Sequence, residues 1–153
     1  MEEEEIKPVK KRPIALIVII AVLGVAAMVG VVLTGLNNKF VNYNYTLFLS
    51  AKALNIGCPK MVSDNLRLDS VAAKVDLQLW YYYTQTDMLK DEDFADSMCV
   101  DYKDAIVENL KGNKDMAEFG KNKVILVFRL ADKEGEELCA AHVGPDEYYS
   151  SPK

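Results

Sequence analysis

The chain has 153 residues, half of them apolar and 27% of them charged, and its formal net charge is −5. An acidic chain is repelled by phosphate backbones, so we expect no nucleic-acid partner. One histidine, three cysteines without a Cys-x-x-Cys pair and the lack of a glycine-rich phosphate loop point to no metal site and no cofactor.

An apolar run without a charged residue covers residues 13–36. A helix of about 20 apolar residues crosses a bilayer, so the run predicts a transmembrane anchor. Four basic residues lie in the 12 residues before it, whereas only Lys39 follows it closely. The positive-inside rule therefore makes residues 1–12 a charged cytoplasmic stub and places the rest of the chain outside the cytoplasm. A cleaved signal peptide is the alternative, but its apolar region is usually shorter.

Small residues recur every four positions along the anchor, at Ala26, Gly30 and Thr34. This spacing lets two helices approach closely, so two copies could associate weakly through the anchor. Small residues are also frequent in spanning helices that do not associate, which is the alternative interpretation.

Beyond the anchor we expect a linker at residues 37–43, one domain over 44–149 and a short tail at 150–153. The first predicted element of the domain is a helix over 44–56, which ends before Gly57. The alternation of apolar and polar residues at its start leaves a strand as the alternative.

A hairpin of two strands is predicted next. Leu66 and Leu68 share a face of the first strand, residues 72–74 form the link, and the second strand covers 75–83. Apolar and aromatic side chains occupy one face of the second strand: Val75, Leu77, Leu79, Tyr81 and Tyr83. The opposite face holds Asp76, Gln78, Trp80, Tyr82 and Thr84.

The clearest helix covers residues 91–111, because large side chains recur every four positions at Phe94, Met98, Tyr102, Ile106 and Leu110. A second hairpin follows, with strands over 124–130 and 136–143 and its turn at residues 132–135. This order of elements predicts an α+β domain, with helices packed on one face of a mainly antiparallel sheet.

Three cysteines allow at most one intramolecular disulfide, which is permitted outside the cytoplasm. We predict the pair Cys58 and Cys139. Cys99 falls on the apolar side of the predicted helix, so we expect it to be a buried thiol.

The candidate binding residues are Trp80 and Tyr82, with Gln78 and Thr84 beside them on the strand face opposite the predicted core. Exposed tryptophan and tyrosine dominate the energetics of many interfaces. The alternative is that another element, such as the helix at 44–56, covers this face.

Three further hypotheses concern ligand binding or catalysis. A small ligand-binding or sensing domain would need a pocket between the helices and the sheet, lined by Tyr81, Tyr83 and Tyr102. An enzyme would most plausibly use the thiol of Cys58, which follows a helix end. The only histidine, His142, lies on a predicted strand, and we expect it to be packed or at an edge rather than to act as a general base.

Several short motifs carry a resemblance: Cys58-Pro59, residues 67–70, the aromatic strand, the long helix and the turn at 132–135. Over residues 45–143 the chain resembles small bacterial envelope proteins of unknown function, which have an N-terminal hydrophobic segment and a compact α+β domain. The resemblance implies a bacterial envelope location and no activity. Together with the predicted anchor, it places the chain in the bacterial cytoplasmic (inner) membrane, with the domain on the outer side. The expected function is a membrane-anchored, non-enzymatic interaction module, with the lipid bilayer and an envelope protein as partners.

Overall fold

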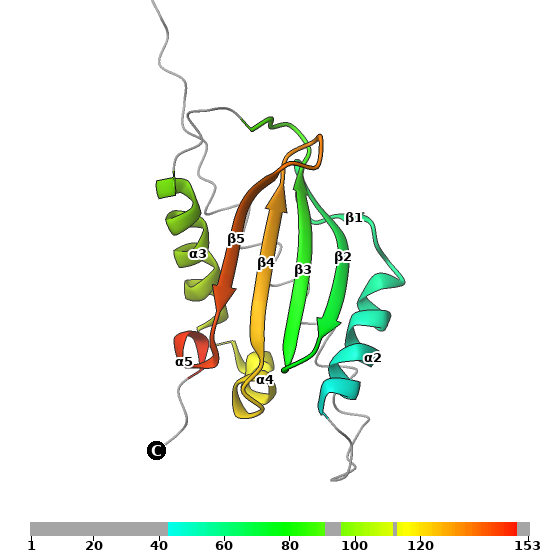
Figure 1. Ribbon diagram of the computed structural model, residues 1–153, viewed down its shortest axis with the longest axis vertical. Coiled ribbons are helices and arrows are strands. Elements are labelled where there is room, and N and C mark those ends of the chain that lie inside the picture. Colours follow the sequence, from blue (N-terminus) through cyan, green and yellow to red (C-terminus); the bar gives the residue numbers. More distant parts are fainter. Residues whose placement is uncertain (1–42, 91–95, 112, 150–153) are drawn as a thin grey trace, which may run out of the picture.

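The structure, a computed structural model, describes residues 43–90, 96–111 and 113–149 (Figure 1). The predicted anchor, the stub, most of the linker, Ala26, Gly30 and Thr34, and the tail lie outside the described residues. The elements in chain order are α2 (Tyr43–Asn55), β1 (Lys60–Met61), β2 (Leu66–Lys74), β3 (Gln78–Gln85), α3 (Asp96–Leu110), η1 (Lys114–Met116), α4 (Ala117–Lys121), β4 (Ile125–Ala131), β5 (Glu137–Val143) and α5 (Pro145–Tyr148).

The five strands form one sheet in the order β1-β2-β3-β4-β5. Every pair of neighbours is antiparallel except β3 and β4, which are parallel. A parallel pair needs a long crossover, and here the segment with α3, η1 and α4 supplies it. The expected α+β domain with a mainly antiparallel sheet is confirmed, and the parallel central pair is its added feature.

Helix α2 confirms the helix predicted over 44–56, to within one residue at each end, and excludes the strand alternative. Its inner face buries Leu47, Ala51 and Leu54 in the core. At its last residue, the Asn55 side chain donates to the carbonyl of Val71 and accepts from the amide of the same residue, both at 2.7 Å. This pair of hydrogen bonds fixes the end of α2 against β2.

The first hairpin is confirmed, but its turn lies later than predicted. Residues 72–74 belong to β2, and the chain reverses at Val75, Asp76 and Leu77. Asp76 and Leu77 adopt the left-handed conformation, with φ of 60° and 57°. Leucine rarely does so, because its Cβ crowds the backbone. Two long-range hydrogen bonds hold Leu77 there: its amide donates to Asn44 Oδ1 at 3.0 Å, and its carbonyl accepts from the Ile125 amide at 2.9 Å.

The long helix is confirmed where the structure describes it, since Tyr102, Ile106 and Leu110 of α3 are all buried. Its expected start at residue 91, with Phe94, lies outside the described residues, and so does the side chain of Met98. The second hairpin has its turn where predicted, and Gly135 takes the positive φ (90°) that this turn requires.

One core lies between the helices and one face of the sheet. The sheet contributes alternating side chains of its central strands, Leu79, Tyr81 and Tyr83 from β3 and Leu126, Phe128 and Leu130 from β4. The rings of Tyr81 and Phe128 stack with their centroids 5.1 Å apart. In Figure 1, α2 lies beside β2 and α3 lies beside β5. Both helices contribute buried residues to the same core as the sheet.

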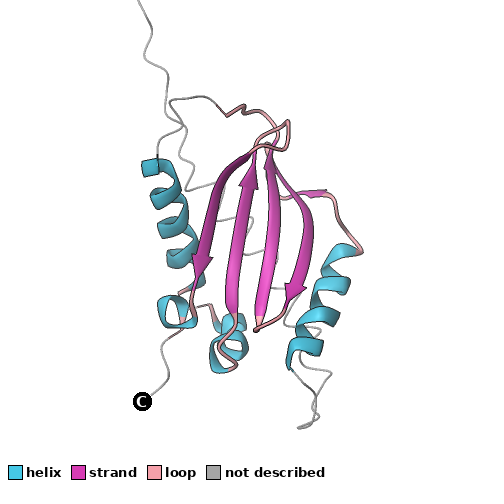
Figure 2. Ribbon diagram, viewed as in Figure 1, coloured by secondary structure: helices cyan, strands magenta, loops and turns pink. Residues whose placement is uncertain are grey.

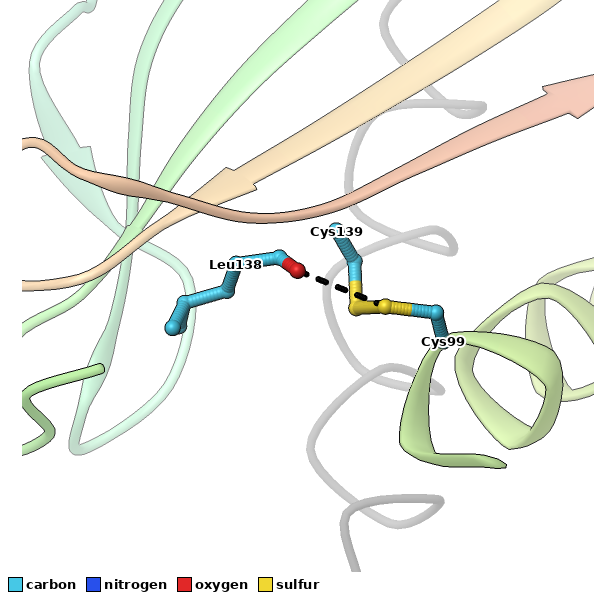
Figure 3. The surroundings of a disulfide bond; sticks show 3 residues. All are labelled: Cys99, Leu138 and Cys139. Atoms are coloured by element: carbon cyan, nitrogen blue, oxygen red, sulfur yellow. Dashed lines mark hydrogen bonds between the residues drawn. A yellow bond between two sulfur atoms is a disulfide. The ribbon is translucent and has the colours of Figure 1, made fainter. Parts of the chain in front are cut away.

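A disulfide joins Cys99 of α3 to Cys139 of β5, with Cα atoms 5.4 Å apart (Figure 3). The predicted pair of Cys58 and Cys139 is therefore wrong, and so is the buried thiol expected at Cys99. Cys58 is a free cysteine between α2 and β1, the strand at the opposite edge of the sheet from β5. The disulfide fixes α3 to the edge strand that it covers.

The buried carboxylate of Asp132 organises the turn between β4 and β5. It accepts hydrogen bonds from the amides of Lys90 (3.0 Å), Glu134 (2.9 Å) and Glu136 (2.8 Å). These bonds, the one from Lys90 above all, hold the pKa of this carboxyl below its usual value. One side chain thus ties the hairpin to the end of the segment after β3.

Replacing this carboxylate should make stability less sensitive to acid. Because the pKa of Asp132 is lower in the folded chain, its contribution is complete above about pH 4 and is lost as the pH falls through the folded value. We expect Asp132→Asn to lower the thermal midpoint at neutral pH and the difference from wild type to shrink in acid. Melting curves between neutral pH and strong acid test this, and a constant difference would contradict it.

Candidate functional site

The face of the sheet opposite the core carries the predicted binding residues. In β3, Gln78, Trp80 and Tyr82 alternate with the buried core residues and are partly exposed. Figure 2 shows the strands with none of the described helices crossing in front of them. The described part of α2 buries its inner side in the core, so it does not cover Trp80 and Tyr82 as the alternative required.

The side chains of Trp80 and His142 pack against each other on this face. Trp80, Val127 and His142 lie side by side across β3, β4 and β5. The rings of Trp80 and His142 meet edge to face, with centroids 5.9 Å apart. Val127 lies between them in the register and is completely buried, although it points away from the core. His142 is thus an exposed edge residue packed on a tryptophan, consistent with the expectation that it is packed or at an edge.

Cations lie over the aromatic rings. The Arg129 guanidinium is 6.0 Å from the centroid of Trp80 and 5.9 Å from that of Tyr82, and the Lys74 ammonium is 5.5 Å from Trp80. Arg129 also forms an ion pair with Glu137. Each cation–π contact at such a partly exposed site is worth about 0.5–1 kcal/mol. We call Trp80, Tyr82, Arg129, His142 and Lys74 the Trp80 cluster.

The two polar candidates have different roles. Gln78 accepts a hydrogen bond of 2.9 Å from the indole N–H of Trp80, which fixes the orientation of the ring. Thr84 is buried and donates to Asp69 at 2.6 Å, so it does not reach a surface. Asp69 also forms an ion pair with Arg67, and both side chains are partly exposed. Gln78 therefore supports the cluster, whereas Thr84 belongs to the framework beneath it.

Sequence reasoning did not select Arg129, His142 and Lys74 for this site. Alternation in β4 places Arg129 opposite Phe128, so a face could have been assigned to it. Arg129 reaches Trp80, however, only because β4 lies next to β3. The sequence did not predict this parallel pairing.

The thiol of Cys58 is not placed for nucleophilic chemistry. It is half-buried and donates to the carbonyl of Leu54 at 3.4 Å. Burial raises its pKa, against the opposing effect of Lys60, whereas a reactive cysteine needs a lowered value. Within the described residues, no group of three His, Cys, Asp or Glu side chains could hold a metal ion.

Tyr81, Tyr83 and Tyr102, the residues of the expected pocket, are buried in the core, and burial raises the pKa of all three. The hydroxyl of Tyr83 is buried and has no hydrogen-bond partner among the described residues. The three side chains therefore pack the domain.

None of the helices between residues 43 and 149 that the structure describes is long and apolar enough to cross a membrane. The predicted anchor at residues 13–36 lies outside the described residues.

Two solved structures share the fold. A crystal structure of a candidate secreted protein from Pseudomonas aeruginosa matches with a TM-score of 0.56 at 11% identity, over 69% of this chain and 92% of that one. The Type II secretion system pilotin AspS from Vibrio cholerae matches with a TM-score of 0.51 at 12% identity, over 68% of this chain and 90% of that one. No curated protein matches the chain by sequence. Residues 42–139 match the family Domain of unknown function (DUF8479), and the chain belongs to this family.

Proposed function

We propose that the protein is a membrane-anchored, extracytoplasmic interaction module that binds an envelope protein through the Trp80 cluster. The anchor is the apolar run at residues 13–36, and the basic residues before it orient the domain away from the cytoplasm. The Cys99–Cys139 disulfide agrees with that location, because such bonds persist in oxidising compartments. The fold likeness to a secretion-system pilotin and a candidate secreted protein is compatible with it.

The observation that carries the proposal is the exposed position of an ordered aromatic cluster. Trp80 and Tyr82 remain partly exposed on a face that no described helix covers. Their rings are held in place by Gln78 and Arg129, so little side-chain entropy remains to be lost when a partner binds. Tryptophan, tyrosine and arginine are the residue types enriched at binding hot spots.

The cluster also defines the chemistry of the partner. The rings offer apolar area, whereas Lys74 and Arg129 bring positive charge to this part of an acidic chain. Glu137 neutralises part of the charge on Arg129. A partner segment with an apolar or aromatic anchor and neighbouring carboxylates would complement this surface.

We expect Trp80→Ala to weaken binding of the partner at least about 30-fold, the effect of losing a hot spot of about 2 kcal/mol. A photoreactive amino acid at Ala140, which is exposed and paired with Arg129, should first capture the partner in the native host cell. Affinity is then measured between the purified partner and each variant of the full chain. Val75→Ala, at a 77% exposed residue in the β2–β3 turn, is the matched control.

Folding and binding are separated by two further measurements. Trp80 is paired with the fully buried Val127 across β3 and β4, so thermal unfolding of Trp80→Ala shows whether the domain is intact. Arg129→Gln removes the cation over both rings and should weaken binding by about 5-fold or more, with the rings retained. Unchanged affinity in folded Trp80→Ala and Arg129→Gln would remove the cluster from the function.

A further inference from the structure

A second exposed apolar surface lies on the outer side of α2, away from the core. Tyr45 is 55% exposed, Phe48 is 48% exposed, and Ile56, just past the helix end, is 89% exposed. With Lys52, they fall on one side of the helix, because residues three and four apart are neighbours. We call Tyr45, Phe48, Lys52 and Ile56 the α2 stripe.

The stripe gives α2 two apolar faces. Its inner face already buries Leu47, Ala51 and Leu54 in the core. A helix at the surface of a water-soluble domain ordinarily carries polar and charged residues on its outer face, and a helix that is apolar all round is usually covered by something else. The outer face of α2 therefore has the composition of a contact surface.

The charge of the stripe identifies what covers it. Lys52 is the only charged residue in α2, within a chain of net charge −5. Its ammonium lies 5.4 Å from the ring of Phe48, which stacks with Tyr45 at 6.4 Å between centroids. Aromatic rings and basic groups without carboxylates are characteristic of helices in the interface of a bilayer, where anionic headgroups attract the cations.

Chain length places this surface close to a bilayer. The apolar run ends at Leu36 and α2 begins at Tyr43, so six residues connect them. Six residues span at most about 20 Å. We propose that the α2 stripe lies in the interface of the phospholipid bilayer that holds the anchor, an inference that rests on the anchoring proposed above. The bilayer then contacts the domain at α2, whereas the Trp80 cluster, on a different surface, binds the protein partner.

The single tryptophan of the chain permits a direct test. Trp80→Phe removes it, and Phe48→Trp then places one reporter on the stripe of the full chain in vesicles of zwitterionic and anionic phospholipids. Val100→Trp, at a 59% exposed residue of α3, is the control, and Ile56→Trp is a second reporter on the stripe. Lipids with bromine in the upper acyl chain should quench about half or more of the stripe emission, since an interfacial helix buries its apolar face to about 5–10 Å. The control should lose about a tenth or less.

Each outcome decides a separate point. Vesicle flotation with strong quenching at positions 48 and 56 supports the proposal. Flotation in which both stripe reporters are quenched no more than the control overturns it and leaves the anchor intact. A blue shift without bromine quenching also overturns it, because a second copy or another protein then covers the stripe. A chain that does not float with the vesicles overturns the anchor and the stripe together.

Discussion

Removing the Cys99–Cys139 disulfide should lower the free energy of unfolding by about 4 kcal/mol, the loop-entropy value for a bond that closes about 40 residues. The closed loop contains most of α3, all of α4 and all of β4. The bond therefore restrains most of the crossover that makes β3 and β4 parallel. Chemical denaturation of Cys99→Ala with Cys139→Ala, compared with wild type under oxidising conditions, measures the difference.

Two comparisons isolate the covalent bond from the packing of the sulfur atoms. Wild type in the presence of a reductant retains both thiols and should lose most of the same stability. Cys58→Ala, at the free and half-buried cysteine, should change it much less. An oxidised wild type that is no more stable than its reduced form would show that noncovalent contacts alone hold α3 on the sheet.

Local patterns predicted much of this fold, because they depend on which face of an element is buried. The alternation of Leu79, Tyr81 and Tyr83 in β3 and the four-residue spacing of Tyr102 and Ile106 in α3 both agree with the buried core. Gly57, after α2, also lies where the helix-stop signal required. In the strand and the helix, the side chains that must leave water are visible in a window of a few residues, and the glycine after α2 is an equally local signal.

Features that depend on distant parts of the chain were not predictable in this way. The turn at Asp76 and Leu77 lacks a glycine, and it is held by the hydrogen bonds that Leu77 donates to Asn44 and accepts from Ile125. The correct disulfide likewise requires that α3 lie beside β5. Cys139 is the partner available to Cys99 only after the crossover has placed the helix there.

The residues of the candidate site also differ in whether a local pattern could predict them. Alternation in β3 assigned Trp80 and Tyr82 to the face opposite the core, and the structure places them there. Arg129 and His142 reach those rings through strand pairing across β4 and β5, which no pattern within β3 contains. Thr84 lies on the same strand, but Asp69 on the neighbouring strand covers it.

Truncating two adjacent residues of β4 should destabilise the domain by very different amounts. Phe128→Ala should lower the free energy of unfolding by about 3–5 kcal/mol, because the side chain is 3% exposed and its ring stacks on Tyr81. Arg129→Ala should cost about 1 kcal/mol or less, since its ion pair with Glu137 and its cation–π contacts are partly exposed. Equilibrium denaturation of both variants under one set of conditions measures the contrast.

This contrast tests the register of β4, which decides which of its side chains lie on the core face of the sheet and which lie on the face of the Trp80 cluster. A shift of one residue in β4 would exchange the faces of Phe128 and Arg129, and with them the faces of every side chain in the strand. Equal destabilisation, or a larger loss for Arg129→Ala, would therefore contradict the assignment of Arg129 to the Trp80 cluster. In the expected case, Arg129→Ala remains folded and loses partner affinity, whereas Phe128→Ala loses stability first. Because the two positions are adjacent in one strand, the contrast reports the burial of Phe128 and the exposure of Arg129.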